Sequence, residues 1–379
     1  MTTLERCHPD LRLIMEAVEI HSPTQYSIFG ELRDYSNQPP AAAAQTPAQT
    51  DARADDSATQ PNFVFQPFLE NDLYSRLYVR PTPGAPAAYN ALAQRDHISA
   101  LSAANNGTGT WEPGWRIISL GDDGRAEVSR DMVSFWVQPT GLSTATGKIR
   151  VGDFCRVRIA KEMRQLMPGF YFAFGNGSQQ ETRDKSDPLV RFYWHLTAEA
   201  AVPYMALATA LLNQARLPFR TKVLSDPTYY VRADAGVLYL ERRHFGAARD
   251  IVREIHERIG PGLRREVPMF TKALADGLGL AEDPNNQMSF GQSRCKIAAR
   301  VLCSCFARGV RDAEERLSML MKAFVDEGLD PASPYLDKNA TDFYSLTGEL
   351  PPMPQRARVT RGARKHKKNR AKKYRGVGA

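Results

Sequence analysis

The chain has 379 residues, of which 42% are hydrophobic and 24% are charged, and its formal net charge is +8. These proportions are ordinary for a globular protein and leave room for a sizeable core and two or three domains. No stretch of the sequence approaches the roughly 18 to 20 apolar residues of a membrane-spanning helix, and the first residues, MTTLERCHPDLRL, lack the apolar core of a secretory signal. The five cysteines have no disulfide or zinc spacing, which favours a reducing cytoplasmic compartment.

The positive charge is concentrated near the C-terminus. Residues 356–375 contain eleven Lys and Arg and no acid, so the rest of the chain has 39 basic against 42 acidic side chains. A block of like charge is typical of a disordered segment that binds anions. We therefore expect residues 341–379 to be a disordered tail, strongly basic from 356, that could contact an acidic peptide or nucleic acid.

The N-terminal region, residues 1–97, is predicted to be mostly helical around a linker. Residues 9–20 and 63–80 place apolar side chains at helical spacing. Between them, residues 36–62 contain no Val, Ile, Leu, Met, Phe, Tyr or Trp and cannot bury apolar surface. The sequence therefore predicts a disordered linker there.

Residues 98–340 are predicted to form the main domain, with a motif-rich core at 189–305. Short β-branched and aromatic runs separated by Gly, Asp and Pro come first, which is typical of antiparallel strands. Helical patterns dominate from residue 199 onward, with one β-hairpin between them. This order favours an α+β fold in which helices pack on one side of an antiparallel sheet.

The predicted hairpin begins at Phe219. Alternation places Arg220 and Lys222 on one face of its first strand, and the second run places Arg232 and Asp234 on one face as well. If residues 225–229 form the loop, Lys222 lies opposite Arg232 and its pKa is lowered. The alternative is an exposed hairpin face that simply carries charges.

Further residues suit an anion-binding pocket. Arg191 lies on the run VRFYWHL, and Arg294 opens a helix behind Ser289 and Gln292, so guanidinium groups and helix N–H groups could hold phosphate together. The alternative is that Ser289 or Ser293 only caps the helix and that Arg294 is a surface residue. His195, at the end of VRFYWHL, is either a satisfied structural histidine or a catalytic acid.

Two other kinds of site are excluded by spacing. The seven histidines form no metal-ligand pattern, so no metal is expected. The run GLGLAED lacks the third glycine and the leading strand of a dinucleotide site. We expect its glycines to allow a tight turn that brings Glu282 and Asp283 inward.

A family likeness extends over residues 110–335. It is carried by VRFYWHL, by ALLNQARLPFRTKVLSDPTYYVRADAGVLYL and by VPMFTKALADGLGLAEDPNNQMSFGQSRCKIAARVL. In these blocks the chain resembles the HopA-type family, which is named after a plant-pathogen type III effector and is also found as stand-alone bacterial proteins. It is similar in particular to the LanY-like lyase partners of class V lanthipeptide and thioamitide biosynthesis.

The resemblance implies a bacterial cytoplasmic lyase that acts after a kinase-like partner, although secretion by a type III route stays open. The partner phosphorylates Ser or Thr of a leader-bearing precursor peptide, and the HopA-like protein eliminates the phosphate to give dehydroalanine or dehydrobutyrine. Neither a cofactor nor a metal is implied. The matching positions are Lys222, Tyr230, Asp234, Tyr239, Glu282, Ser289, Gly291, Gln292 and Arg294.

β-Elimination needs a base for the Cα proton and stabilisation of the charge that develops. Lys222, with its pKa lowered by Arg232, is the predicted base. Asp234 and Glu282 are predicted to orient the basic residues.

The departing phosphate needs cations and a proton donor. Arg191 and Arg232, like His195, match the biosynthetic branch of the family, and both arginines are predicted to bind phosphate together with Arg294, Ser289 and Gln292. Ser293 stands where many relatives have His, so Tyr230 or His195 would have to protonate the leaving group.

A different class of function stays open. The chain could be a non-enzymatic, effector-like protein that binds a host protein or an export chaperone through its first 62 residues. A third hypothesis, nucleic-acid binding through the tail, predicts an affinity that falls steeply with salt.

Overall fold

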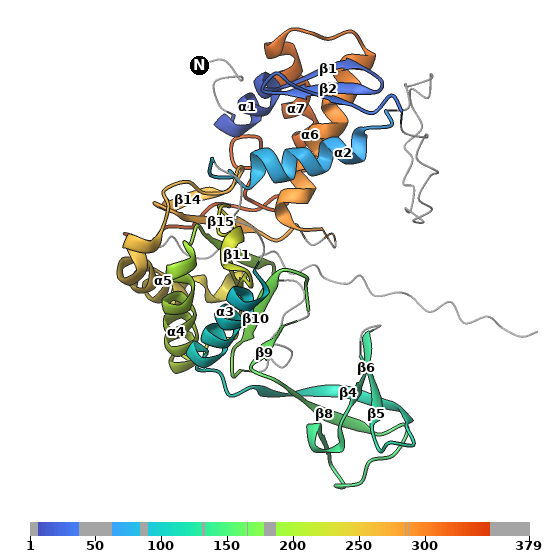
Figure 1. The fold of residues 1–379 in the computed structure, drawn as a ribbon, viewed down its shortest axis with the longest axis vertical. Coiled ribbons are helices and arrows are strands. Elements are labelled where there is room, and N and C mark those ends of the chain that lie inside the picture. Colours follow the sequence, from blue (N-terminus) through green and yellow to red (C-terminus); the bar gives the residue numbers. More distant parts are fainter. Residues whose placement is uncertain are drawn as a thin grey trace, which may run out of the picture.

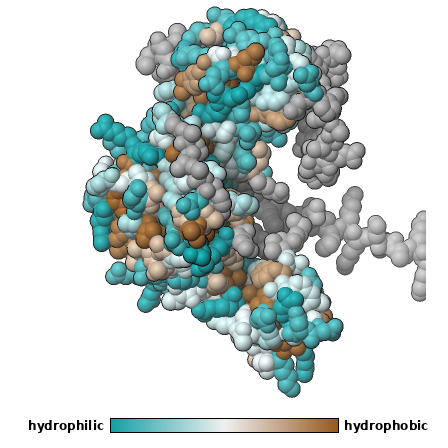
Figure 2. Space-filling view, viewed as in Figure 1, coloured by the Kyte–Doolittle hydropathy of each residue, from teal (hydrophilic) through white to brown (hydrophobic). Residues whose placement is uncertain are grey.

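The structure is a computed structural model that describes residues 7–37, 63–83, 90–130, 133–164, 166–177, 187–284, 286 and 288–348. The expected linker, apart from its first two residues, and the strongly basic part of the tail lie outside these residues. Figure 1 shows an elongated molecule with three lobes, and the upper one combines the first described elements of the chain with the last two helices, α6 (Phe290–Ala307) and α7 (Ala313–Asp326). Hydrophilic and hydrophobic side chains are interspersed over the face seen in Figure 2.

The upper lobe combines a three-stranded sheet with four helices and a π-helix. Its elements are α1 (Pro9–Ala17), β1 (Val18–Ser22), β2 (Gln25–Ile28), β3 (Glu31–Asp34), α2 (Gln66–Asp72), the π-helix Leu73–Tyr78, α6 (Phe290–Ala307) and α7 (Ala313–Asp326). The N-terminal region is thus less helical than expected. The alternating run VEIHSPTQYSI has strand periodicity around a Pro-Thr turn and forms the β1–β2 hairpin.

The middle lobe contains an antiparallel sheet of seven strands in the order β14-β15-β11-β13-β12-β10-β9. The strands are β9 (Glu162–Met163), β10 (Phe170–Phe174), β11 (Leu189–Trp194), β12 (Arg220–Leu224), β13 (Gly236–Glu241), β14 (Lys272–Ala275) and β15 (Leu278–Glu282). Three helices accompany it: α3 (Ala91–Ala104), α4 (Ala198–Gln214) and α5 (Phe245–Ile259). The predicted α+β fold with an antiparallel sheet is confirmed.

Helices α4 and α5 cover one face of this sheet. The ring centroid of Trp194 lies 5.2 Å from that of Tyr204 on α4, and Phe192 stacks on Phe245 of α5 at 5.9 Å. Thr221 faces the same way, because its hydroxyl lies 2.8 Å from the Tyr204 hydroxyl. Since side chains alternate along a strand, residues of the opposite parity point to the other face.

The lower lobe is a five-stranded antiparallel sheet with a small core of its own. Its strands, in the order β6-β5-β4-β8-β7, are β4 (Thr110–Leu120), β5 (Ala126–Arg130), β6 (Val133–Val137), β7 (Leu142–Thr144) and β8 (Phe154–Ile159). Trp115, Ile117 and Val157 are buried between its strands. The segment that was expected to be one domain, residues 98–340, therefore contains two separate cores.

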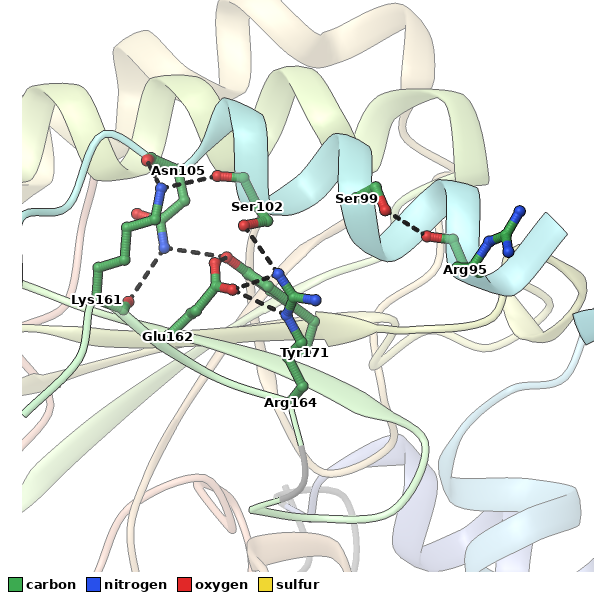
Figure 3. Close-up of polar contacts among 8 residues, drawn as sticks. All are labelled: Arg95, Ser99, Ser102, Asn105, Lys161, Glu162, Arg164 and Tyr171. Carbon is green, nitrogen blue, oxygen red and sulfur yellow. Dashed lines mark hydrogen bonds and ion pairs between the residues drawn. The ribbon is translucent and has the colours of Figure 1, made fainter. Parts of the chain in front are cut away.

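A polar network fixes the base of the lower lobe to the middle one (Figure 3). Lys161, just after β8, donates to the carbonyl oxygens of Ser102 and Asn105 at 2.9 Å each and so caps the end of α3. The Asn105 amide donates to the Tyr171 hydroxyl, which in turn donates to Glu162. The lower lobe is thus anchored where its last strand leaves it.

Two expected boundaries differ from the structure. The boundary at 97/98 falls inside α3, which is continuous from Ala91 to Ala104. The expected disordered tail from residue 341 is wrong for residues 341–348, because Phe343 and Tyr344 are buried against the core and the Tyr344 ring lies 4.9 Å from that of Phe245. The aromatic run DFYSL supplies the apolar surface that holds this segment.

Candidate functional site

The face of the seven-stranded sheet opposite α4 and α5 carries a group of charged and aromatic side chains. Residues that pair directly across an antiparallel sheet point to the same face. One row runs Arg191, Tyr239, Arg220 and Phe174, and the next runs Tyr193, Val237, Lys222 and Phe172. Strand register alone therefore places two arginines, a lysine and two tyrosines beside one another, and this set is called the polar face.

Tyr239 lies between two guanidinium groups. The guanidinium carbon of Arg191 is 5.5 Å from the ring centroid of Tyr239, and that of Arg220 is 4.6 Å from it. Burial raises the pKa of Tyr239 to about 12, although both arginines act in the opposite direction. Arg191 also pairs with the Asp283 carboxylate at 2.6 Å.

Lys222 is half-buried among soft, apolar groups. Its Nζ lies 3.9 Å from the ring centroid of Phe170, 5.9 Å from that of Phe172 and 3.4 Å from the Met167 sulfur. Aromatic faces stabilise a cation less well than water or a carboxylate does. The ammonium group is therefore poorly solvated.

The pKa of Lys222 is lowered to about 8, and burial is the main cause. The Asp234 carboxylate acts to raise this pKa, while the nearby charges of Arg191 and Arg232 lower it further. The sequence predicted a lowered pKa caused by Arg232. The direction agrees, but desolvation contributes more than the arginine does.

Arg232 reaches this group from a loop rather than from a strand. The predicted pairing of Lys222 with Arg232 is wrong, because Lys222 pairs with Val237 and the connection from β12 to β13 includes the 3₁₀ turn Pro227–Tyr229. Arg232 makes a bidentate ion pair with the buried Asp234, with one contact at 2.8 Å. Burial acts to raise the pKa of Asp234, but Arg232, Lys222 and Tyr74 together outweigh it and hold that pKa below its usual value.

Aromatic side chains from the upper lobe close over the polar face. Tyr74, on the π-helix, donates to Asp234 at 3.1 Å and stacks on Tyr78 at 5.0 Å between ring centroids. A Cβ at Gly291 would lie 2.4 Å from the Tyr78 ring, so only glycine allows α6 to approach so closely. Neither tyrosine was predicted as a site residue from the sequence, because both lie more than 100 residues before the motifs.

Tyr230 and Glu282 lie apart from the polar face. The Tyr230 hydroxyl donates to the Leu224 carbonyl at 2.6 Å and lies 3.1 Å from His97 of α3. Glu282 is fully buried on the opposite face of β15 and accepts a hydrogen bond from the amide of Asp337. Its neighbour Asp283, and not Glu282, pairs with an arginine of the polar face.

His195 is 1% exposed, at the end of β11. Its Nδ1 lies 2.8 Å from the Glu266 carbonyl, and its Nε2 has no hydrogen-bond partner among the described residues. Burial lowers the pKa of this imidazole, with the Asp234 charge acting weakly in the other direction. His195 therefore lies near the polar face as a neutral, oriented ring.

The start of α6 is satisfied internally. The Gln292 amide donates to the Ser289 hydroxyl and the Ser289 amide donates to the Gln292 side chain, which together form a capping box. Arg294 is 1% exposed and donates to the carbonyl oxygens of Pro334 and Leu336. Of the three arginines predicted to bind phosphate, Arg191 and Arg232 thus lie near Lys222, whereas Arg294 lines a different cavity.

Within the described ranges, no helix has both the length and the apolar character needed to cross a membrane. A search of the same residues finds no group of three or more His, Cys, Asp or Glu that could hold a metal ion.

Residues 162–336, from β9 to the segment after α7, match the HopA1 effector protein family. The chain carries a HopA1-type domain. This domain includes the whole seven-stranded sheet and the charged side chains of the polar face, while Tyr74 and Tyr78 come from outside it. The expected HopA-type resemblance is confirmed.

No curated protein sequence matches the chain. Two solved structures, the effector protein from Pseudomonas syringae pv. tomato strain DC3000 and that from Pseudomonas syringae pv. syringae strain 61, are each similar to it at 16% identity with a TM-score of 0.42. The matches cover 74% and 73% of this chain and 98% and 96% of those chains. With TM-scores this low, the family assignment depends on the HopA1-type domain alone.

Proposed function

We propose that the protein is a phosphoserine/phosphothreonine lyase. Its substrate would be a leader-bearing precursor peptide phosphorylated by a kinase-like partner, and its product a peptide with dehydroalanine or dehydrobutyrine. The observation that carries this proposal is the polar face, where a lysine with a pKa of about 8 lies beside three arginines. A base and an anion site on one surface are what elimination of phosphate requires.

In the proposed reaction, the neutral Nζ of Lys222 removes the Cα proton of the phosphorylated residue. With a pKa of about 8, about a tenth of the molecules have this amine neutral at pH 7. The electron pair of the Cα–H bond forms the Cα=Cβ double bond, and the Cβ–O bond breaks with its pair going to phosphate. No oxidation or reduction takes place, so the step needs no redox cofactor.

Arg191 and Arg220 would bind the phosphate as charge accumulates on it, because guanidinium groups bind phosphate oxygens in a bidentate manner. Tyr239 lies between them and its hydroxyl is protonated at neutral pH, so it can donate a proton to the leaving oxygen. Tyr239 suits this role better than Tyr230, whose hydroxyl already donates to a backbone carbonyl.

The test is incubation of the protein with a phosphothreonine peptide, followed by mass spectrometry and a phosphate assay. We expect release of phosphate together with a peptide that has lost the mass of phosphoric acid. Hydrolysis would release phosphate but leave an intact threonine, so the peptide mass separates the two reactions. No loss of phosphate from any of a panel of phosphoserine and phosphothreonine peptides would contradict the proposal.

A second candidate follows from the family description, which is of effector proteins. In that case the polar face would bind a phosphorylated host protein, or the N-terminal region an export chaperone, without any reaction. Saturable binding of a phosphopeptide whose mass never changes would favour this function over the lyase.

A further inference from the structure

A second cationic site lies outside the polar face, in a cavity of about 520 Å³ between α6 and the chain that follows α7. Arg294, Ile297 and Arg300 of α6 line one side of it, and Leu329 and Lys338 line the other. This volume is larger than inorganic phosphate needs and lies in the range of sites for small organic ligands. The cavity therefore has room for a side chain together with neighbouring backbone.

The guanidinium of Arg294, which lines this cavity, is only partly hydrogen-bonded. Its Nε and Nη2 donate to two backbone carbonyls at 2.9 Å each, but Nη1 has only a 3.4 Å contact with the Ser293 hydroxyl. No carboxylate among the described residues lies within 4.0 Å of it, and burial lowers its pKa to about 10 despite the more distant Asp337. A buried, unpaired cation is energetically unfavourable until an anion joins it.

The rim of the cavity adds further positive charge. Lys296, Arg300 and Lys338 line it together with Arg294, against two carboxylates. One of these, Glu327, is already engaged by Arg300 at 3.1 Å and by Lys338 at 4.0 Å. The lining thus favours an anion, while the apolar side chains favour an organic one.

One aromatic ring, Phe290, lies near both this cavity and the polar face. The Arg294 guanidinium carbon lies 4.9 Å from the ring centroid of Phe290, which in turn lies 6.4 Å from that of Tyr193 on the polar face. Phe290 therefore contacts both the arginine of the cavity and a tyrosine of the polar face.

We propose that the cavity binds a second anionic side chain of the substrate peptide, a carboxylate or a phosphate, distinct from the residue that reacts. This inference rests on the proposed function. The cavity would then select peptides that carry an acidic or second phosphorylated residue at a fixed distance from the reacting one.

The test compares two labelled peptides that contain no Ser or Thr and so cannot react: one has several Glu residues, and the other has Gln in their place. Fluorescence anisotropy measures their affinities for the full-length protein and for the double variant Lys296→Ala/Lys338→Ala, which changes only the rim. The matched control is Lys322→Ala, an exposed lysine on α7 that pairs with Asp326 at 2.6 Å. Lys222→Ala serves as the control for the polar face.

We expect the wild-type protein to bind the Glu peptide about tenfold more tightly than the Gln peptide, and the rim variant to lose this preference. Lys322→Ala and Lys222→Ala should keep it. Equal affinities in the wild type, an unchanged preference in the rim variant, or an equal loss in either control would overturn the proposal. In the Lys222→Ala background, a peptide with one phosphothreonine in place of Glu decides between phosphate and carboxylate as the preferred anion.

Phosphate release from a phosphothreonine peptide is measured in parallel. A rim-dependent preference without phosphate release would refute the lyase and leave the anion cavity standing. Phosphate release without the preference would refute the anion cavity and leave the lyase standing.

Discussion

The two faces of the seven-stranded sheet use alternate residues of the same strands but differ in what surrounds them. On β11, Phe192 and Trp194 pack under α5 and α4, whereas Arg191 and Tyr193 point to the polar face. The covered face gains stability from buried apolar area, at about 25 cal/mol per Å². The polar face holds cations near one another, which is unfavourable. We infer that the first face provides the rigidity that holds the second in place.

The largest expected effect comes from removing the base on the polar face. Lys222→Ala should lower the rate of phosphate elimination about a thousandfold, since a positioned general base contributes 10²- to 10⁴-fold. The protein should remain folded, because this side chain is only half-buried and has no ion-pair partner within 4.0 Å among the described residues. Steady-state kinetics and thermal unfolding check the two expectations, and a variant with the wild-type rate would remove Lys222 from the mechanism.

A substitution on the face covered by α4 and α5 should lower the stability of the protein and leave its elimination rate nearly unchanged. Phe245→Ala removes a fully buried ring that contacts Phe192 and Tyr344, and should cost about 3 to 5 kcal/mol of unfolding free energy. The rate per folded molecule should stay within about twofold of the wild type. Denaturant unfolding measures the first quantity. A large loss of rate with unchanged stability would contradict the division between the faces.

The pH dependence tests how the charges of the polar face act on one another. The elimination rate should rise with pH through about 8, because only the neutral amine of Lys222 can accept a proton. The Asp234 carboxylate raises the pKa of Lys222, so Asp234→Asn should move the midpoint of this profile to lower pH. Profiles of kcat/KM against pH for both proteins are the measurement. An unchanged or higher midpoint in the variant would show that Asp234 does not set the Lys222 pKa.

The smallest effect is expected from a substitution of Thr221, which is next to Lys222 in the sequence but points to the face covered by α4 and α5. Thr221→Val removes hydrogen bonds to the Tyr204 hydroxyl and the Val237 carbonyl, and should destabilise the protein by about 1 kcal/mol. Its elimination rate should match the wild type, so it is the position-matched control for Lys222→Ala. A rate loss comparable to that of the lysine variant would mean that strand geometry, and not the amine, limits the reaction.

The alternation of side chains predicted which residues of the first hairpin strand share a face, and the structure confirms that Arg220 and Lys222 do. The same alternation could not predict which residue of the partner strand lies opposite Lys222. The loop between β12 and β13 contains a 3₁₀ turn, and β13 begins only at Gly236. For this reason Val237, and not Arg232, lies opposite Lys222. Arg232 still lies close enough to affect the pKa of the lysine, although it comes from a loop whose path local periodicity does not predict.

Strand register also decides which of two neighbouring acids, Glu282 or Asp283, lies near the polar face. In the run GLGLAED, the expected tight turn is confirmed at Gly277, which has a φ of +69°, but the residues that follow form β15, which is hydrogen-bonded to β11 and β14. Whether Glu282 or Asp283 approaches Arg191 depends on the register between β15 and β11, and a shift of one residue reverses the answer. The position of Tyr74 and Tyr78 depends on contacts between residues more than 100 positions apart, so it could not be predicted from local sequence patterns either.

Tyr74 and Tyr78 precede the segment that matches the family, yet Tyr74 bonds to Asp234 and Tyr78 packs on Gly291. Residues outside the family segment therefore complete the surroundings of the polar face. A protein shortened to residues 162–336 would expose the Arg232–Asp234 pair to water and leave a hollow beside Gly291. If this segment were transferred into another protein, it would keep the structure of the polar face only if Tyr74 and Tyr78 were transferred as well. The residues that precede the family segment therefore form one structural unit with it.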